Sequence, residues 1–205
     1  MSYFSEHAPE VTPRWPTEAS GLRVAQLGAA WAAASYFTLD KGPAQIVLPT
    51  GVGKTAVMTL LPYLVPTGRL LVVTPSRVVR DQAAAEFKSL SRLRAVGAVP
   101  SALVPPKVFV AEHRMADWNS VVESDVVVGT PSVLSPAHEG VAAPPVGLFD
   151  LVLIDEAHHA AAPTWSRILT DFEGTRAALL TATPFRLDQR GLPGEISTTI
   201  RFARR

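Results

Sequence analysis

The sequence predicts an α/β domain built on a mostly parallel β-sheet with helices on both of its faces. Most of its short apolar runs are continuously apolar rather than alternating, which is typical of strands buried on both faces of a parallel sheet. Helical stretches separate these runs, and this alternation favours a parallel sheet covered by helices. The expected strands are Gln45–Leu48, Leu70–Thr74, Lys107–Ala111, Val126–Gly129, Leu151–Asp155 and Ala177–Thr181.

Longer stretches before and between these strands are expected to be helices. They are Leu22–Phe37, Lys54–Leu64 and Arg77–Leu93. Residues 1–20 carry three prolines and are expected to form an extended lead-in. We therefore expect one domain over residues 21–190, and we expect residues 191–205 to begin a linker.

Composition limits the classes of protein to which the chain can belong. Hydrophobic residues make up 47% and charged residues 18% of the 205 residues, which favours a packed core over disorder. The formal net charge is +1, so a surface that binds nucleic acid would have to be local. The absence of cysteine excludes disulfides and thiolate metal sites. No apolar run approaches the roughly 20 residues that span a bilayer, and no secretory signal is visible, so we expect a cytoplasmic protein with no membrane partner.

A phosphate-binding loop is predicted between the first expected strand and the helix after it. The run Pro49–Thr55 has glycines whose backbone N–H groups can turn toward an anion at the positive N-terminus of the helix. The Lys54 ammonium can then reach the β- and γ-phosphates of a nucleotide, and the Thr55 hydroxyl can bind Mg²⁺. The residues expected to hold the nucleotide here are Thr50, Gly51, Val52, Gly53, Lys54 and Thr55.

This loop departs from the general phosphate-loop pattern at one position. Leu48 stands where the pattern has its first glycine, although the later glycines, the lysine and the threonine are all present. An ordinary glycine turn before a helix is the alternative interpretation. The strand–loop–helix context favours the phosphate loop.

The second candidate site is the acidic pair Asp155 and Glu156, which follows the apolar run Leu151–Ile154. Carboxylates at the carboxyl end of a buried parallel strand lie at the edge where such sheets bind ligands. Asp155 is expected to hold Mg²⁺ through its water shell, and Glu156 to orient or deprotonate an attacking water. A helix N-cap followed by a first-turn acid would explain the same pair, but the phosphate loop upstream favours catalysis.

Six short motifs follow one another along most of the chain: Leu22–Gln26, Pro49–Thr55, Thr74–Arg77, Gly129–Pro131, Asp155–His159 and Leu180–Arg186. In this order they resemble the first RecA-like domain of a superfamily 2 DEAD/DEAH-box helicase. Within that group the chain is most similar to the helicase subunit of type III restriction enzymes. The resemblance implies a RecA-like P-loop fold, ATP and Mg²⁺ as cofactors, and ATP-driven helicase or translocase activity on nucleic acid.

The resemblance also implies roles for single residues. Gln26, with Arg23 in the same motif, would bind the adenine edge, and an exposed helix position is the alternative interpretation of Gln26. His158 would join Lys54, Asp155 and Glu156 as a catalytic residue, and its structural alternative is a packed core histidine. Thr181 and Thr183 would couple the ATP site to the nucleic-acid face. A metal site at His158 and His159 is disfavoured, because neighbouring side chains on a helix diverge and no cysteine completes a ligand set.

By the same resemblance, nucleic acid would bind at two strand-to-helix turns, with DNA favoured over RNA. Backbone N–H groups, hydroxyls and a guanidinium there would hold phosphates without reading bases. Arg77 and Arg80 could equally be solvated helix charges. Trp118 and Trp165 could stack on bases, although burial is the more common role of such residues. The residues expected to contact nucleic acid are Pro75, Ser76, Arg77, Gly129 and Thr130.

The sequence ends shortly after Pro184, whereas helicases of this kind continue into a second RecA-like domain that supplies an arginine finger. Such a finger contributes about 10³–10⁵ in rate in comparable systems, so we expect this chain alone to turn ATP over slowly. Two function classes stay open. The chain is either a helicase component completed by a second domain, or a nucleotide-gated module that binds nucleic acid or protein without productive turnover.

Overall fold

A single parallel β-sheet forms the centre of the computed structural model, which describes residues 2–15, 21–40, 42–157, 163–172, 174–182 and 198–201. Among these residues seven strands pair in the order β3-β4-β2-β5-β6-β1-β7, and every pairing between them is parallel. The strands are β1 Ala44–Val47, β2 Leu70–Val73, β3 Val108–Val110, β4 Val126–Gly129, β5 Leu151–Asp155, β6 Arg176–Thr181 and β7 Thr198–Arg201. The predicted fold class is confirmed.

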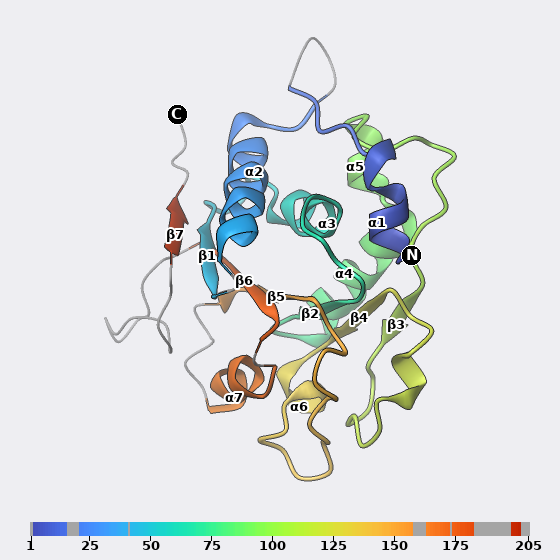
Figure 1. The fold of residues 1–205 in the computed structure, drawn as a ribbon, viewed down its shortest axis with the longest axis vertical. Helices are drawn as coiled ribbons and strands as arrows, with labels where there is room; N and C mark the ends of the chain where they lie inside the picture. Colours follow the sequence, from blue (N-terminus) through green and yellow to red (C-terminus); the bar gives the residue numbers. More distant parts are fainter. Residues whose placement is uncertain are drawn as a thin grey trace.

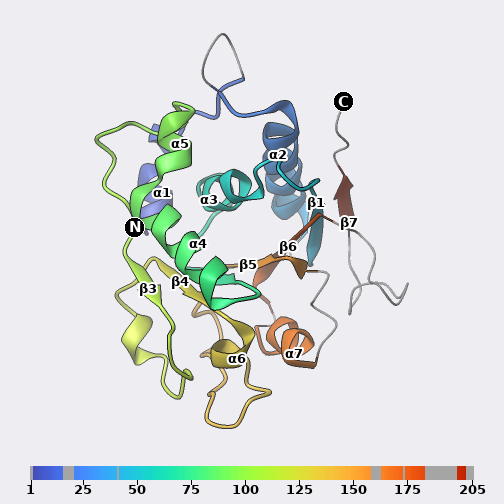
Figure 2. The ribbon, with the colours of Figure 1, turned by 180° about the vertical axis from the view of Figure 1, so that it is seen from behind.

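Helices cover both faces of the sheet, as Figures 1 and 2 show from opposite sides. One face carries α1 Tyr3–His7, α2 Val24–Leu39, α3 Lys54–Leu64, α4 Arg77–Ser89 and α5 Ser91–Ala95. The other face carries α6 Pro131–Leu134 and α7 Pro163–Asp171. Two short 3₁₀ turns, Ala8–Glu10 and Asn119–Val121, complete the described elements. No helix in the described ranges is long and apolar enough to cross a membrane.

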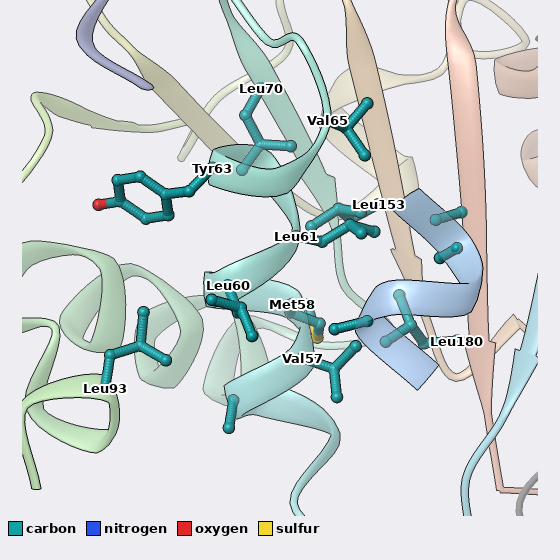
Figure 3. Close-up of a cluster of buried hydrophobic side chains, with 14 of the residues drawn as sticks. Val57, Met58, Leu60, Leu61, Tyr63, Val65, Leu70, Leu93, Leu153 and Leu180 are labelled. Carbon is teal, nitrogen blue, oxygen red and sulfur yellow. The ribbon is translucent and has the colours of Figure 1, made fainter. Parts of the chain in front are cut away.

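The two faces of the sheet bury two separate hydrophobic clusters. Along β2, Leu70 and Val72 belong to the cluster under α2 and α3, whereas Leu71 and Val73 belong to the cluster under α6 and α7. This alternation follows from the two-residue period of a strand. Figure 3 shows the first cluster around α3, whose apolar side chains cover β5 at Leu153 and β6 at Leu180. Because the strands are buried on both faces, their sequences are continuously apolar.

Three predicted element boundaries need correction. Residues 1–20 are not simply extended, because α1 forms at Tyr3–His7 and buries Phe4, whose ring centroid lies 5.0 Å from that of Tyr63. The predicted helix Arg77–Leu93 is two helices, because Leu90 takes a left-handed conformation (φ 52°) that ends α4. Within the predicted linker, Thr198–Arg201 forms the edge strand β7 beside β1.

Candidate nucleotide site

The predicted phosphate loop and acidic pair lie together at the carboxyl edge of the sheet. The loop follows β1, the acids end β5, and β6 pairs with both of these strands. In register, Thr181 of β6 is opposite Val47, and Leu180 is opposite Asp155. The backbone N–H of Leu48 also donates to the Thr181 carbonyl oxygen over 2.9 Å. Two motifs that lie far apart in the sequence are thus separated by one strand, at the edge where open α/β sheets bind ligands.

Glycine is required at two positions of the phosphate loop. Gly51 and Gly53 have φ values of 79° and 95°, in the left-handed region that other residues avoid. A Cβ on Gly53 would also clash with the side-chain nitrogen of Gln26. Gly53 is the N-cap residue of α3, so the loop runs directly into the N-terminus of an 11-residue helix. Successive N–H groups in such a turn, added to the helix dipole, form an anion-binding concavity.

Gln26 and Arg23 hold this loop from α2. The Gln26 side-chain nitrogen donates to the carbonyl oxygens of Val52 (2.9 Å) and Gly53 (3.2 Å), and its oxygen accepts from the Arg23 N–H (2.8 Å). The Arg23 guanidinium donates to the Gly51 carbonyl oxygen over 2.7 Å. Gln26 is therefore buried, not an exposed helix residue. Its predicted contact with adenine stays a prediction, and since both amide hydrogens bind the loop, the amide oxygen is the group left to make it.

Lys54 and the acidic pair form a connected group of charges. The Lys54 ammonium donates to Glu156 Oε1, and the Glu156 backbone N–H donates to Asp155 Oδ1 over 3.0 Å. Glu156 has a φ of 52°, a conformation that costs free energy in a non-glycine residue and that is common at functional sites. Burial raises the pKa of Asp155 and the neighbouring Glu156 carboxylate adds to the rise, while Lys54 and the hydrogen bond from Glu156 oppose it.

Thr55 and Asp155 offer the oxygen atoms that Mg²⁺ prefers. Both line one groove of about 390 Å³ between α3 and α4. A cation would relieve the unfavourable burial of the Asp155 charge, so the donor set fits Mg²⁺. The described ranges contain no cluster of three or more His, Asp or Glu side chains that could hold a metal unaided. This arrangement suits an ion delivered with nucleotide phosphates, as is usual for Mg²⁺.

A second cavity, of about 300 Å³, lies beside the phosphate loop, which lines it at Gly51, Val52 and Gly53. Arg23, Gln26 and Gly53 line it on one side. Its other wall comes from α5, through Arg92, Ala95 and Val96. Its position beside Gln26 suits the base and sugar of a nucleotide. No sequence motif pointed to this α5 wall, because the helix break at Leu90 that creates it has no glycine or proline.

The predicted nucleic-acid contacts lie at the same edge of the sheet, on the strands next to the acidic pair. β2 pairs with β5 on one side and with β4 on the other, so the turns that begin at Pro75 and Thr130 are neighbours. Ser76 Oγ caps α4 by accepting from the Val79 N–H, and Thr130 Oγ1 lies 2.9 Å from Ser132 Oγ. Arg77 is exposed at the start of α4.

Two further alternatives from the sequence are settled by burial. Arg80 is not a solvated charge, because it is buried, forms an ion pair with Asp81 and donates to the Ala111 carbonyl oxygen. Trp118 and Trp165 are both buried, so packing, not base stacking, is their role in this structure. Thr181 is fully buried at the end of β6, whereas His158 and Thr183 lie outside the described residues.

Comparison with known proteins gives one family. A family model described as "Type III restriction enzyme, res subunit" matches residues 20–186. A search of curated proteins finds no significant match.

Solved structures match this fold at low sequence identity. A hypothetical ATP-dependent RNA helicase from Sulfolobus tokodaii has a TM-score of 0.60 and 21% identity, over 98% of this chain and 57% of that one. The Pyrococcus furiosus Hef helicase domain has a TM-score of 0.57 and 20% identity, over 87% of this chain and 37% of that one. The UvsW helicase of bacteriophage T4 has a TM-score of 0.55 and 18% identity, over 88% of this chain and 59% of that one. The chain thus spans 37–59% of the length of these proteins, and at such identities the likeness shows the fold.

Proposed function

The chain belongs to the family of type III restriction enzyme res subunits and has the RecA-like fold of helicase domains, and from this premise we propose that it is the ATP-binding domain of a nucleic-acid helicase or translocase. The observation that carries the proposal is the meeting of Lys54 and Glu156 at a glycine-built anion site. A lysine and a carboxylate in contact beside such a loop are the groups needed to bind a phosphate chain and to direct water at it.

The Lys54–Glu156 ion pair gives ATP binding a direct chemical consequence. When phosphates enter the loop, their oxygens compete with Glu156 for the Lys54 ammonium. Glu156 can then accept a proton from, or orient, the water that attacks the γ-phosphate. Thr55 and Asp155 would hold Mg²⁺, which neutralises phosphate charge when bound. The pair therefore keeps the base occupied until a nucleotide is present.

The nucleic-acid strand would run over the turns at Pro75–Arg77 and Gly129–Thr130, beside the acidic pair. Backbone N–H groups and hydroxyls at such turns bind phosphates without reading bases. The preference for DNA over RNA stays a prediction, since the Sulfolobus neighbour is described as an RNA helicase. A second RecA-like domain, from a longer chain or another subunit, would complete the ATP site, because an arginine finger adds about 10³–10⁵ in rate.

ATP binding and hydrolysis by the chain, with Lys54→Ala beside it, test this proposal. Lys88 lies exposed near the end of α4 and lines neither cavity, so Lys88→Ala is a control with the same change in charge. We expect ATP to bind the chain and the Lys88 variant equally, and to bind Lys54→Ala at least tenfold more weakly. Equal binding to all three proteins would contradict the proposal.

The alternative is a nucleotide-gated binding module without productive turnover. Both interpretations need ATP binding, so hydrolysis separates them. Addition of nucleic acid and of a second RecA-like domain from a family member should stimulate ATP turnover if the chain is a helicase domain. Lys54-dependent binding without any stimulated turnover would favour the binding module.

A further inference from the structure

Arg92 lies at the junction of the two cavities beside the phosphate loop. It lines the cavity that contains Arg23 and Gln26, and it also lines the groove that contains Thr55 and Asp155. The first turn of α3 also lines both cavities, the groove at Thr55 and the cavity beside Gln26 at Ala56. A nucleotide with its base in one cavity and its terminal phosphates toward the other must pass this point.

The position of Arg92 is set by the corner between α4 and α5. The left-handed Leu90 turns the chain, and Leu93 then packs in the core on the side of α3 that carries Leu60 (Figure 3). Figure 2 shows the resulting position of α5, beside α3 and after the end of α4. Since Leu93 is fully buried, the backbone of Arg92 is anchored one residue away.

Glu86 holds the start of α5 from the last turns of α4. Its buried carboxylate accepts from the Arg92 backbone N–H (2.7 Å) and from Ser91 Oγ (2.8 Å). The same carboxylate lies 3.4 Å from Arg92 Nε. These hydrogen bonds fix the position of the Glu86 carboxylate, so the Arg92 guanidinium is oriented against it.

The Arg92–Glu86 contact does not use the whole guanidinium. The Arg92 side chain is 56% exposed while that of Glu86 is 8% exposed. Within the described residues, the terminal nitrogens of Arg92 make no hydrogen bond, whereas those of Arg23 and Arg80 bind backbone carbonyl oxygens. A guanidinium has five donors in a planar fork that matches phosphate. Arg92 therefore has donors to offer a ligand at the junction.

We propose that Arg92 binds the phosphate nearest the ribose of the bound nucleotide and that Glu86 is its positioning residue. The inference rests on the proposed nucleotide site. Lys54 and the Mg²⁺ ligands account for the β- and γ-phosphates, and Gln26 lies beside the base. The α-phosphate is the anionic group that lies between them, over the first turn of α3. Arg92 thus makes the site select nucleoside phosphates of any length over the free nucleoside.

Affinities for ADP and ATP, measured by competition with a fluorescent ADP, test the role of Arg92. We expect Arg92→Ala to weaken both nucleotides about tenfold and by similar factors, since both carry the α-phosphate. Arg92→Lys should recover part of this loss, because an ammonium keeps the charge without the fork. Lys88→Ala removes the same charge from the preceding helix and should change neither affinity.

The role of Glu86 is tested by a double-mutant cycle with Arg92. Glu86→Gln keeps an oxygen that accepts from the Arg92 N–H, and its amide nitrogen can donate to Ser91 Oγ, but it loses the charge, so we expect a smaller fall in affinity. In the Arg92→Ala background the same substitution should have no further effect on ADP binding. Thermal unfolding of each variant shows that the folded protein is being compared. A purely structural Glu86 would weaken ADP binding equally in both backgrounds, which would overturn its positioning role.

The two proposals fail in different ways. If Lys54→Ala binds ADP and ATP as tightly as the parent chain, the nucleotide site itself is wrong. If Lys54→Ala loses affinity while Arg92→Ala, folded and equally stable, keeps it, the site stands and the inference about Arg92 is overturned.

Discussion

The two ends of the sheet both carry charged side chains beside a cavity, but they use their charges differently. At the amino end, the Arg69 guanidinium donates to the carbonyl oxygens of Ser124, Leu148 and Val122, and Asp150 accepts from the N–H groups of Gly68 and Arg69. The cavity there measures about 460 Å³, more than the 300 Å³ of the cavity beside Gln26. The charges of Arg69 and Asp150 are nevertheless bound by backbone groups, which stay in place.

At the carboxyl end the charges are paired with one another. Lys54 is bound by Glu156, and both can exchange this partner for a phosphate and a water. The loop beside them is held in left-handed conformations at Gly51 and Gly53, which cost conformational freedom and leave N–H groups for an anion. The comparison indicates that exchangeable partners and left-handed backbone, not the size of a cavity, distinguish the proposed nucleotide site from the amino end.

Among the variants that compare the two ends of the sheet, Glu156→Gln is expected to have the largest effect. We expect nucleic-acid-stimulated ATP hydrolysis, measured with a second RecA-like domain present, to fall about 10²–10⁴-fold, because the amide cannot accept the proton. ATP binding should be retained, since Lys54 loses a competing anion. Asp150→Asn is the matched change at the amino end, and it should leave turnover unchanged while lowering stability. Equal losses of turnover in the two variants would remove the distinction between the ends.

Gly53→Ala tests whether the left-handed glycine loop is what binds the nucleotide. A Cβ at this φ of 95° would displace the buried Gln26 amide and break its hydrogen bonds to the loop. We expect ADP affinity to fall at least tenfold and stability to fall by about 1–3 kcal/mol. Gly97 also has a positive φ, 63°, but open space around its Cβ position. Gly97→Ala should therefore lose about 1 kcal/mol and no ADP affinity, and loss of affinity in both would show a general effect of strain.

The sequence predicted the fold well because its signals were local and of one kind. Continuously apolar strands such as Leu70–Val73 can be stable only between two layers of helices, which specifies a parallel sheet. The candidate phosphate loop and acidic pair could be located for the same reason, since each is a short run at the end of such a strand. The comparison with solved structures confirms the resulting architecture.

Features that depend on contacts between distant residues could not be predicted. Leu90 is left-handed although leucine does not favour that region, and the hydrogen bonds of Glu86 to the next helix show what compensates for it. Phe4 anchors a helix because Tyr63, 59 residues later (63 minus 4), provides a buried partner. The engagement of Gln26 by the loop carbonyls is also tertiary, so a sequence motif could indicate its importance but not its present partners.

Arg69→Ala makes the complementary test at the amino end, where we expect loss of stability without loss of function. Removal of the guanidinium leaves three carbonyl oxygens without their donor, partly exposed to water. We expect the free energy of unfolding in urea to fall by about 2–3 kcal/mol. ADP affinity of the folded variant should not change. A fall in ADP affinity larger than the fall in stability would show that the amino end takes part in nucleotide binding.

Asp155→Asn is expected to have the smallest effect on stability, and this effect is a gain, whereas Gly53→Ala and Arg69→Ala are expected to lower stability. Burial and the nearby Glu156 carboxylate raise the pKa of Asp155 in the folded protein, so folding favours its protonated form. Stability from this group is therefore greatest below the unfolded-state pKa of about 3.9 and falls as the pH rises toward the raised folded value. At neutral pH the nucleotide-free Asn variant, which has no charge to bury, should unfold at a slightly higher temperature than the parent chain. The same substitution removes a Mg²⁺ ligand, so the stabilisation that Mg²⁺ and ADP give the parent should be reduced in the variant. A lower unfolding temperature without ligand would mean that attraction to Lys54 outweighs the cost of burying the Asp155 charge. The charges at the carboxyl end of the sheet would then be as well stabilised as those at the amino end.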